Sequence, residues 1–236
     1  MMLHITRLSN GEPEIFRSIQ GEGVNSGMSV AFLRLAFCNL RCSWCDTKYS
    51  WDWQQYDQKS EVVILSSEEI VKHIRALGIK HLVVTGGEPL IQQTELNNVL
   101  LPLKMEGYYI EIETNGTIPP TNDLLSLADQ WNVSPKLENS GNPLAVREVL
   151  EAYSVFTSLS SSYFKFVIID ESDLNEVRTL TNKYRIAPTR VLLMPEGTER
   201  EKVLARGRWL VDVCREQGYR FCTRLHILLW DNTRGM

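Results

Sequence analysis

Three cysteines within eight residues are the most chemically distinctive feature of the sequence. Cys38, Cys42 and Cys45 lie in the segment Cys-Asn-Leu-Arg-Cys-Ser-Trp-Cys. Thiolates are the usual ligands of iron–sulfur clusters, and a 4Fe–4S cube normally takes four of them. Three close thiolates therefore predict a cube in which one iron has no protein ligand. An open metal position of this kind is typical of a catalytic site rather than a structural one.

The remaining cysteines and the histidines do not extend this triplet into a closed metal site. Cys214 lies in an amphipathic helix pattern and Cys222 in a strand pattern, so we expect both to be buried in the core, as free cysteines usually are. Zinc sites favour paired Cys-x2-Cys units together with histidine. A zinc site and simple packing of the thiols are the alternatives to a cluster. The histidines, none at zinc-finger spacing from the triplet, are His4, His73, His81 and His226.

A second motif, Thr85-Gly86-Gly87-Glu88-Pro89, follows a strand-like segment. A Gly-Gly pair alone is usually a turn, but it also allows a ligand to approach the backbone closely. Together with the cysteine triplet and Trp44 before its last cysteine, the motif resembles the radical S-adenosylmethionine superfamily. The resemblance implies that the open iron binds the amino and carboxylate groups of S-adenosylmethionine, whose cleavage yields a hydrogen-abstracting 5′-deoxyadenosyl radical. The cofactor-binding residues that it implies are Trp44, Asp46, Gly87, Glu88, Asn115, Ser134, Pro135, Lys136 and Glu196.

Further motifs narrow the resemblance to one family and extend it over almost the whole chain. They are Phe16 to Gly23 (Phe-Arg-Ser-Ile-Gln-Gly-Glu-Gly), Phe32 to Leu35, Cys45-Asp46-Thr47, Ser134-Pro135-Lys136 and Met194 to Gly197. Together they resemble the 7-carboxy-7-deazaguanine synthase family. This resemblance implies a carbon–nitrogen lyase that converts 6-carboxy-5,6,7,8-tetrahydropterin to 7-carboxy-7-deazaguanine, with ring contraction and loss of ammonia, in queuosine biosynthesis. It also implies a magnesium ion, an electron donor such as flavodoxin or ferredoxin, and a homodimer.

The chemistry of several residues agrees with a carboxylated pterin as substrate. Arg34 has a planar fork that suits a carboxylate, although a buried ion pair within the protein would also satisfy it. Gln20 offers a donor and an acceptor, and Glu22 can accept from an amino-pyrimidine edge, although this segment could also be a surface turn. The substrate-binding residues implied by the resemblance are Ile19, Gln20, Gly21, Glu22, Arg34, Thr85 and His226.

Two residues have more specialised expected roles. Thr47 follows the last cysteine, and the resemblance implies that its hydroxyl is a magnesium ligand; without the family it would be a helix cap. His226 follows the last predicted strand and could donate to the substrate carboxylate or shuttle a proton.

Apolar, β-branched and aromatic segments alternate with helical patterns, as in parallel βα units. Because the polar motifs follow the predicted strands directly, and a barrel gathers the carboxyl ends of its strands around one opening, we predict an α/β fold with a partial (βα)6-type barrel. A doubly wound sheet is the alternative. The predicted strands are 30–37, 81–85, 108–113, 130–133, 163–169, 190–194 and 219–225. The predicted helices are 66–78, 94–105, 122–128, 143–152, 172–184 and 198–217, the first with a Ser66/Glu69 capping box.

Length and composition fit one globular unit with a small-molecule substrate. The chain has 236 residues, 43% of them hydrophobic and 23% charged, which is typical of a globular enzyme. Its net charge of −4 argues against a broad basic face for nucleic acid. No segment approaches the roughly twenty apolar residues of a membrane span. We expect a single radical S-adenosylmethionine domain over residues 1–236, with 1–29 as an N-terminal substrate-binding extension, in the cytoplasm.

The superfamily pattern leaves two segments unexplained. Residues 48–62 contain Tyr49, Trp51 and Trp53, and we expect them to form a lid or a cover for the cluster, or else to pack against the core. Residues 141–162 separate Ser-Pro-Lys from the next strand, so we expect the helix there to be short or irregular.

Three other functions would account for part of the sequence. An activase of glycyl-radical enzymes also has Cys-x3-Cys-x2-Cys but does not require Gln20 to Glu22 or Thr47. An iron–sulfur electron carrier would not need Gly-Gly-Glu-Pro or a substrate-binding arginine, and would not bind S-adenosylmethionine. A structural zinc domain would be colourless and would cleave no cofactor.

Overall fold

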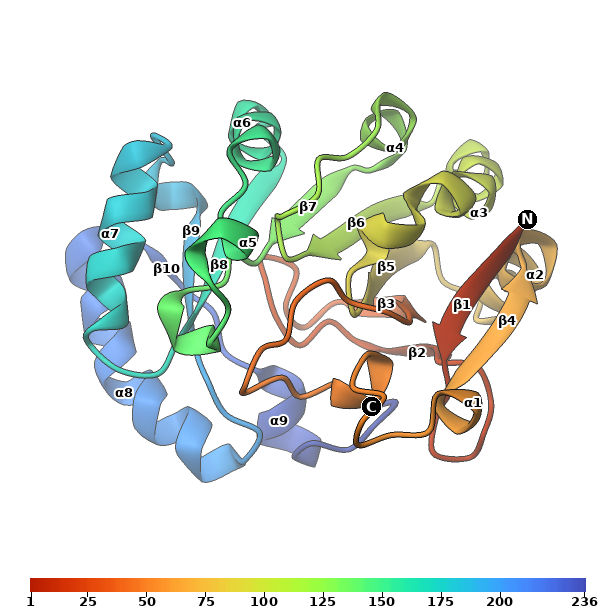
Figure 1. The fold of residues 1–236 in the computed structure, drawn as a ribbon, viewed down its shortest axis with the longest axis horizontal. Helices are drawn as coiled ribbons and strands as arrows, with labels where there is room; N and C mark the ends of the chain where they lie inside the picture. The colour runs from red at the N-terminus through yellow and green to blue at the C-terminus, as the bar shows by residue number, and fades with distance from the viewer.

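A computed structural model describes all residues 1–236, and its ten strands form one curved sheet with most helices on the outer face (Figure 1). Strand order is β10-β9-β8-β7-β6-β5-β3-β1-β4, and β2 also pairs with β3. The strands are β1 Met2–Thr6, β2 Ile15–Ile19, β3 Ser29–Leu35, β4 Val62–Ser66, β5 His81–Gly86, β6 Tyr109–Thr114, β7 Gln130–Val133, β8 Ser162–Ile168, β9 Val191–Pro195 and β10 Arg220–Phe221.

Strands β3 and β5 to β10 are parallel and follow one another in chain order around the sheet. A doubly wound sheet reverses its strand order at a switch point, and this sheet has no such reversal. Its ends, β4 and β10, do not pair, so the predicted partial barrel is confirmed as an open one. The helices are α1 Gln58–Glu61, α2 Ser67–Ala76, α3 Gln93–Met105, α4 Asn122–Leu127, α5 Leu144–Arg147, α6 Leu150–Ser158, α7 Asp173–Lys183, α8 Arg200–Gln217 and α9 Leu225–Trp230, with 3-10 turns η1 Lys48–Ser50, η2 Pro89–Gln92, η3 Glu138–Ser140 and η4 Pro188–Arg190.

The parallel strands are apolar toward the helices and polar toward the concave face. Leu82, Val84, Ile110 and Ile112 belong to the main core of 38 buried residues under the helices. Successive side chains of a strand point to opposite faces, so the residues between them point inward. The inward-pointing polar residues include Thr85, Glu111, Glu113, Gln130, Asn132 and Lys165, of which all but Glu113 are at most 8% exposed. Such groups must find partners in the interior, and this requirement shapes the site.

The predicted helix cap at Ser66 is confirmed: its side chain accepts from the backbone of Glu69, whose carboxylate accepts from the backbone of Ser66. The predicted helix 143–152 is wrong as one element. Residues Glu148 and Val149 are extended and separate α5 from α6.

No helix is both long enough and apolar enough to cross a bilayer.

One further prediction about strands was wrong, and three strands were not predicted. The antiparallel strands β1, β2 and β4 were not predicted: β2 has no continuous apolar run, and β4, although apolar from Val62 to Leu65, is a half-exposed edge strand paired with β1. The predicted strand 219–225 is reduced to β10, because Leu225 donates its backbone N–H to Gly21 at 2.9 Å and begins helix α9 instead. His226 therefore lies on a helix that crosses toward the Gln20–Gly23 segment.

Candidate active site

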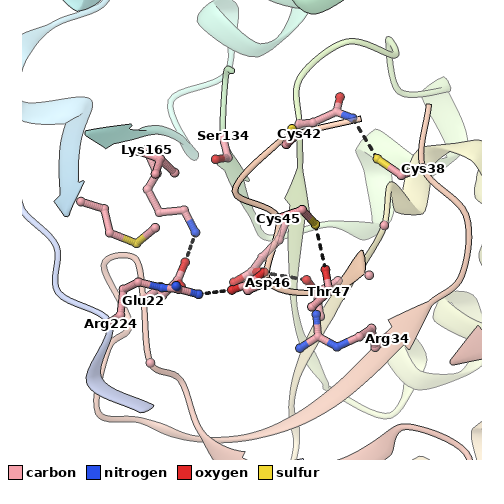
Figure 2. A pocket seen from close by; sticks show the side chains of 18 of the residues that line it. Glu22, Arg34, Cys38, Cys42, Cys45, Asp46, Thr47, Ser134, Lys165 and Arg224 are labelled. Atoms are coloured by element: carbon pink, nitrogen blue, oxygen red, sulfur yellow. Dashed lines mark hydrogen bonds and ion pairs between the residues drawn. The ribbon is translucent and has the colours of Figure 1, made fainter. Parts of the chain in front are cut away.

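A cavity of about 210 Å³ opens at the carboxyl ends of the parallel strands (Figure 2). Of the predicted site residues, Glu88 and Pro135 do not line it. Those that do are Ile19, Gln20, Gly21, Glu22, Arg34, Cys38, Cys42, Trp44, Cys45, Asp46, Thr47, Thr85, Gly87, Asn115, Ser134, Lys136, Glu196 and His226.

The cysteine loop leaves β3 through a strained residue. Phe37 has φ of 74°, a conformation that costs a non-glycine residue about 1–3 kcal/mol. Two backbone hydrogen bonds of 2.7 Å hold it, from the N–H of Phe37 to Ser50 and from the N–H of Glu88 to Phe37. This turn directs Cys38 into the cavity rather than along the strand.

Each cysteine sulfur lies within reach of an N–H group. The contacts are Leu40 backbone N–H to Cys38 at 3.5 Å, Asn142 Nδ2 to Cys42 at 3.2 Å and Trp51 Nε1 to Cys45 at 3.3 Å. Burial raises the pKa of the Cys38 thiol to about 12 and also raises that of Cys42, so these groups become thiolates through metal binding, which deprotonates a ligating thiol outright. Three soft donors, each with a hydrogen-bond donor at its sulfur, fit an iron–sulfur cluster.

The glycines after β5 are required by the neighbouring strand. A Cβ on Gly86 would lie 2.1 Å from the carbonyl oxygen of Leu35, and one on Gly87 would lie 2.0 Å from that of Phe37. We expected the glycines to allow a ligand to approach the backbone. They also allow the Gly-Gly backbone to pack directly against the backbone of Leu35 and Phe37, at the start of the cysteine loop.

Glu88 lies beneath the cavity and is fully buried. Its carboxylate accepts from the backbone N–H of Asn115 at 2.7 Å, the hydroxyl of Thr114 at 2.8 Å and the backbone N–H of Leu90 at 3.0 Å. Burial raises its pKa despite these donors. Glu88 thus joins the loops that follow β5 and β6, and it is connected to the cavity through Thr114 and Asn115, which line it.

The other predicted cofactor residues that line the cavity come from the cysteine loop and from the ends of β7 and β9. Lys136 Nζ donates to the Ser134 hydroxyl at 2.9 Å and lies 5.5 Å from the centre of the Trp44 ring. Glu196 is paired with Arg206, and Asp46 with Arg224. Ser134 and Lys136 thus face the cavity with hydrogen-bonding capacity to spare, whereas both acids are already paired.

A buried ion network crosses the cavity floor (Figure 2). The carboxylate of Glu22 contacts Lys165 through one oxygen and Arg224 Nε at 3.0 Å through the other, and Arg224 also contacts Asp46. Burial by itself would raise the pKa of Glu22, but the charges of Lys165 and Arg224 outweigh it, and the pKa is well below its usual range. Burial lowers the pKa of His226, so its imidazole, 4.0 Å from Glu22, is neutral near pH 7.

Arg34 forms an ion pair within the protein and also lines the cavity, so both of the roles considered from the sequence are open to it. Its Nε donates to Glu14 at 2.8 Å, and Glu14 also accepts from Thr6 at 2.8 Å and Tyr49 at 3.2 Å. The two terminal amino groups of Arg34 have no hydrogen-bond partner in the protein, and the side chain lines the cavity. The ion pair thus orients the guanidinium and leaves its outer edge available to an anion.

Gln20 is held by two glutamates of β6. Its amide donates to Glu111 at 2.8 Å and to Glu113 at 3.2 Å, and Thr85 donates to Glu113 at 2.9 Å. Burial raises the pKa of Glu113, which lines the cavity. This places a carboxyl group of weakened acidity beside the expected substrate-binding segment.

Thr47 stands before η1, at the position of a cap, but its side chain makes no capping hydrogen bond. Its hydroxyl lies 3.6 Å from Cys45 Sγ and lines the cavity. The alternative role of a side-chain cap therefore does not hold, and the hydroxyl is available to a ligand.

Sequence reasoning missed several residues of the site, and the signal for most was a charge in an apolar strand. Lys165 stands between Phe164 and Phe166, and Glu113 lies in an Ile-Glu-Ile-Glu-Thr run; strand alternation directs both inward. Arg224 has no comparable signal, because the turn before α9 places it. The other residues missed were Glu14 and Asn142, which contact Arg34 and Cys42. Trp51, in the segment expected to cover the cluster or to pack, contacts Cys45.

Comparison with known proteins agrees with this geometry. Residues 33–137 match the model of the Radical SAM superfamily. The chain is 41% identical over 225 residues to 7-carboxy-7-deazaguanine synthase of Pyrobaculum aerophilum (94% of this chain and 95% of the relative) and 33% identical over 230 residues to that of Rhodopirellula baltica (94% and 87%). The fold is similar to the crystal structure of QueE from Escherichia coli, with a TM-score of 0.71, 24% identity and coverage of 96% and 95%.

The open parallel barrel with a cysteine triplet at its carboxyl-terminal rim is therefore that of a radical S-adenosylmethionine enzyme, a class that uses a 4Fe–4S cluster and S-adenosylmethionine. Within this class, the chain belongs to the 7-carboxy-7-deazaguanine synthase family.

Proposed function

We propose that this protein converts 6-carboxy-5,6,7,8-tetrahydropterin to 7-carboxy-7-deazaguanine in queuosine biosynthesis, using the cluster and S-adenosylmethionine. The observation that carries the proposal is that one cavity contains both the cysteine triplet and the outer edge of the Arg34 guanidinium. A carboxylated substrate bound to Arg34 would then lie in the same enclosure as the cofactor. Family membership supplies the reaction class.

The cysteines would hold the cluster, and Ser134, Lys136 and the backbone at Gly87 would bind S-adenosylmethionine. When bound, these groups supply hydrogen-abstracting radical chemistry, which is the cofactor's own. The protein contributes orientation and exclusion of water. The buried floor of paired charges around Glu22 is fully assembled before substrate arrives, so little reorganisation is needed on binding.

Arg34 would bind the substrate carboxylate through its two terminal amino groups, a geometry that suits bidentate pairing. Glu113 and Gln20 would hydrogen-bond the ring, and the raised pKa of Glu113 equips it to hold or accept a proton at a ring nitrogen. Glu22, although paired with Lys165 and Arg224, has lone pairs left for an amino group, since an ionised carboxylate offers about four acceptor sites. Residues 1–29 would thus contribute to substrate binding through Ile19 to Glu22.

Anaerobic reconstitution followed by product analysis tests the proposal. With carboxytetrahydropterin, S-adenosylmethionine, magnesium and a reductant, the protein should form 5′-deoxyadenosine together with 7-carboxy-7-deazaguanine. A parallel reaction replaces the pterin by a glycyl-radical polypeptide. Cleavage that depends on the polypeptide and yields no deazaguanine would contradict the synthase and favour the activase.

We propose that Thr47 is a magnesium ligand, because its hydroxyl faces the cavity without a cap role, and magnesium is commonly completed by waters and substrate oxygens. Thr47→Ala should weaken the magnesium stimulation of turnover by about tenfold. Thr47→Ser keeps the hydroxyl and should retain most of the response. The measurement is initial rate against magnesium concentration, and the same dependence in Thr47→Ala and the parent would exclude the ligand role.

For partners, we propose a one-electron donor of the flavodoxin or ferredoxin type and a homodimer in the cytoplasm. The exposed apolar side chains of Leu144 and Val146 on α5 and Leu150 at the start of α6 offer one surface for association. Light scattering of the purified protein measures the mass directly.

A further inference from the structure

The two segments that the superfamily pattern leaves unexplained meet at the cysteine loop. Trp51, from residues 48–62, donates its indole N–H to Cys45 at 3.3 Å. Asn142, from residues 141–162, donates its side-chain amide to Cys42 at 3.2 Å. Both donors are buried, at 8% exposure each. These are the only side-chain N–H groups within 3.5 Å of the three sulfurs.

Each donor is held in place by the loop itself. The Arg41 guanidinium lies 4.8 Å from the centre of the Trp51 ring and donates to the carbonyl oxygens of Cys38 at 2.7 Å and Leu40 at 2.9 Å. The side-chain oxygen of Asn142 accepts from the backbone N–H of Arg41 at 2.9 Å. Arg41 therefore links both donors to the loop.

Asn142 is also fixed from its own side. Its side-chain amide also donates to the Ser140 hydroxyl at 3.1 Å, and its backbone carbonyl accepts from Arg147 Nε at 3.1 Å. Trp51 is held by its backbone N–H, which donates to Lys48 at 3.0 Å. Neither donor needs to move to reach its sulfur, so the contacts are features of the fold.

Hydrogen bonds to ligand sulfurs are among the factors that set the reduction potential of an iron–sulfur cluster. The reduced form of the one-electron couple carries more negative charge, so an N–H donor stabilises it more than the oxidised form. We infer that Trp51 and Asn142 are positioning residues that raise the reduction potential of the cluster through Cys45 and Cys42, and so ease its one-electron reduction. This inference rests on the proposed function only in assuming the cluster.

Trp51→Phe tests the inference because it keeps an aromatic ring for Arg41 and removes the indole N–H together with the smaller ring that carries it. Trp53→Phe is the matched control, since Trp53 lies in the same segment, packs against Phe37 with ring centres 5.9 Å apart, and its indole N–H contacts none of the three sulfurs. Both reconstituted proteins should contain as much iron as the parent. In a dithionite titration followed by electron paramagnetic resonance, Trp51→Phe should show a reduced-to-oxidised ratio about tenfold lower at a fixed potential, a shift of about 59 mV to more negative potential.

Equal midpoint potentials in Trp51→Phe and Trp53→Phe would overturn the inference. If Trp51→Phe holds no iron, benzothienylalanine at position 51, which replaces the N–H by sulfur in a ring of the same shape, undergoes the same comparison. Asn142→Asp keeps the oxygen that accepts from Arg41, removes the donor and adds a negative charge. Both changes should make its potential more negative, so the comparison at Trp51 decides the inference. The redox titration contains no pterin, so its result is independent of the turnover assay described under the proposed function. If the potential shifts but the turnover assay yields no deazaguanine, only the proposed function is contradicted. If the turnover assay yields deazaguanine but the potential does not shift, only this inference is contradicted.

Discussion

Cys42→Ala should reduce cluster iron to background and abolish cleavage of S-adenosylmethionine. The physical reason is that the chain offers the cluster only three thiolate ligands. With two, a second iron would lack a protein ligand, and the cluster would be held too loosely to bind the cofactor. The measurements are iron and sulfide content after anaerobic reconstitution, and 5′-deoxyadenosine formed with dithionite. Normal cofactor cleavage by Cys42→Ala would show that the assignment of the cluster is wrong.

The matched control for this experiment is Cys214→Ala. Cys214 is as buried as Cys42, at 3% and 7% exposure, but it is a residue of α8 and belongs to the main core. It should load iron normally despite a modest loss of stability. Cys222 is a less clean control, because its sulfur accepts the backbone N–H of Gly23 at 3.0 Å beside the expected substrate-binding segment, although its replacement should also leave the cluster intact.

Arg34→Lys should lower kcat/KM for carboxytetrahydropterin by about a hundredfold, because a modest displacement of a substrate from near-attack geometry costs that much. Lysine keeps a positive charge for Glu14, which also has Thr6 and Tyr49 as donors, so the floor of the cavity should remain intact. What is lost is the planar fork, which a lysine cannot replace at a bidentate site. The measurement is deazaguanine formation alongside 5′-deoxyadenosine.

Iron content and S-adenosylmethionine binding should be unchanged in Arg34→Lys, which separates a substrate role from a structural one. Arg17→Lys is the matched control, because Arg17 lies on the adjacent strand β2 with a single contact, to Ser29 at 3.3 Å, at the protein surface. It should turn over at the parental rate. Full turnover by Arg34→Lys would reject the carboxylate contact and leave Arg34 as the partner of Glu14 only.

Much of the parallel barrel could be predicted because its strands are short apolar runs separated by helical periodicity. Strand β7 was predicted to the residue, and α2 was delimited by the capping box at Ser66. The antiparallel strands β1, β2 and β4 escaped prediction, since their pairing depends on partners elsewhere in the chain and their own residues alternate only weakly. The break between α5 and α6 at Glu148 was also not predictable, because no helix-breaking residue lies at or next to this position.

The residues of the site divide in the same way. The cysteine triplet, the Gly-Gly-Glu-Pro motif and the Gln20 to Glu22 segment are contiguous patterns, so the sequence by itself determined which chemistry this protein performs and which segments surround it. Only the tertiary structure decided the pairing of side chains: Glu14 with Arg34, Glu22 with Lys165 and Arg224, and Asn142 with Cys42 across 100 positions of chain. The physical reason is that a buried charge or amide must find its partner wherever the fold brings one within hydrogen-bond distance, and that distance is set by the assembled barrel rather than by neighbours in sequence.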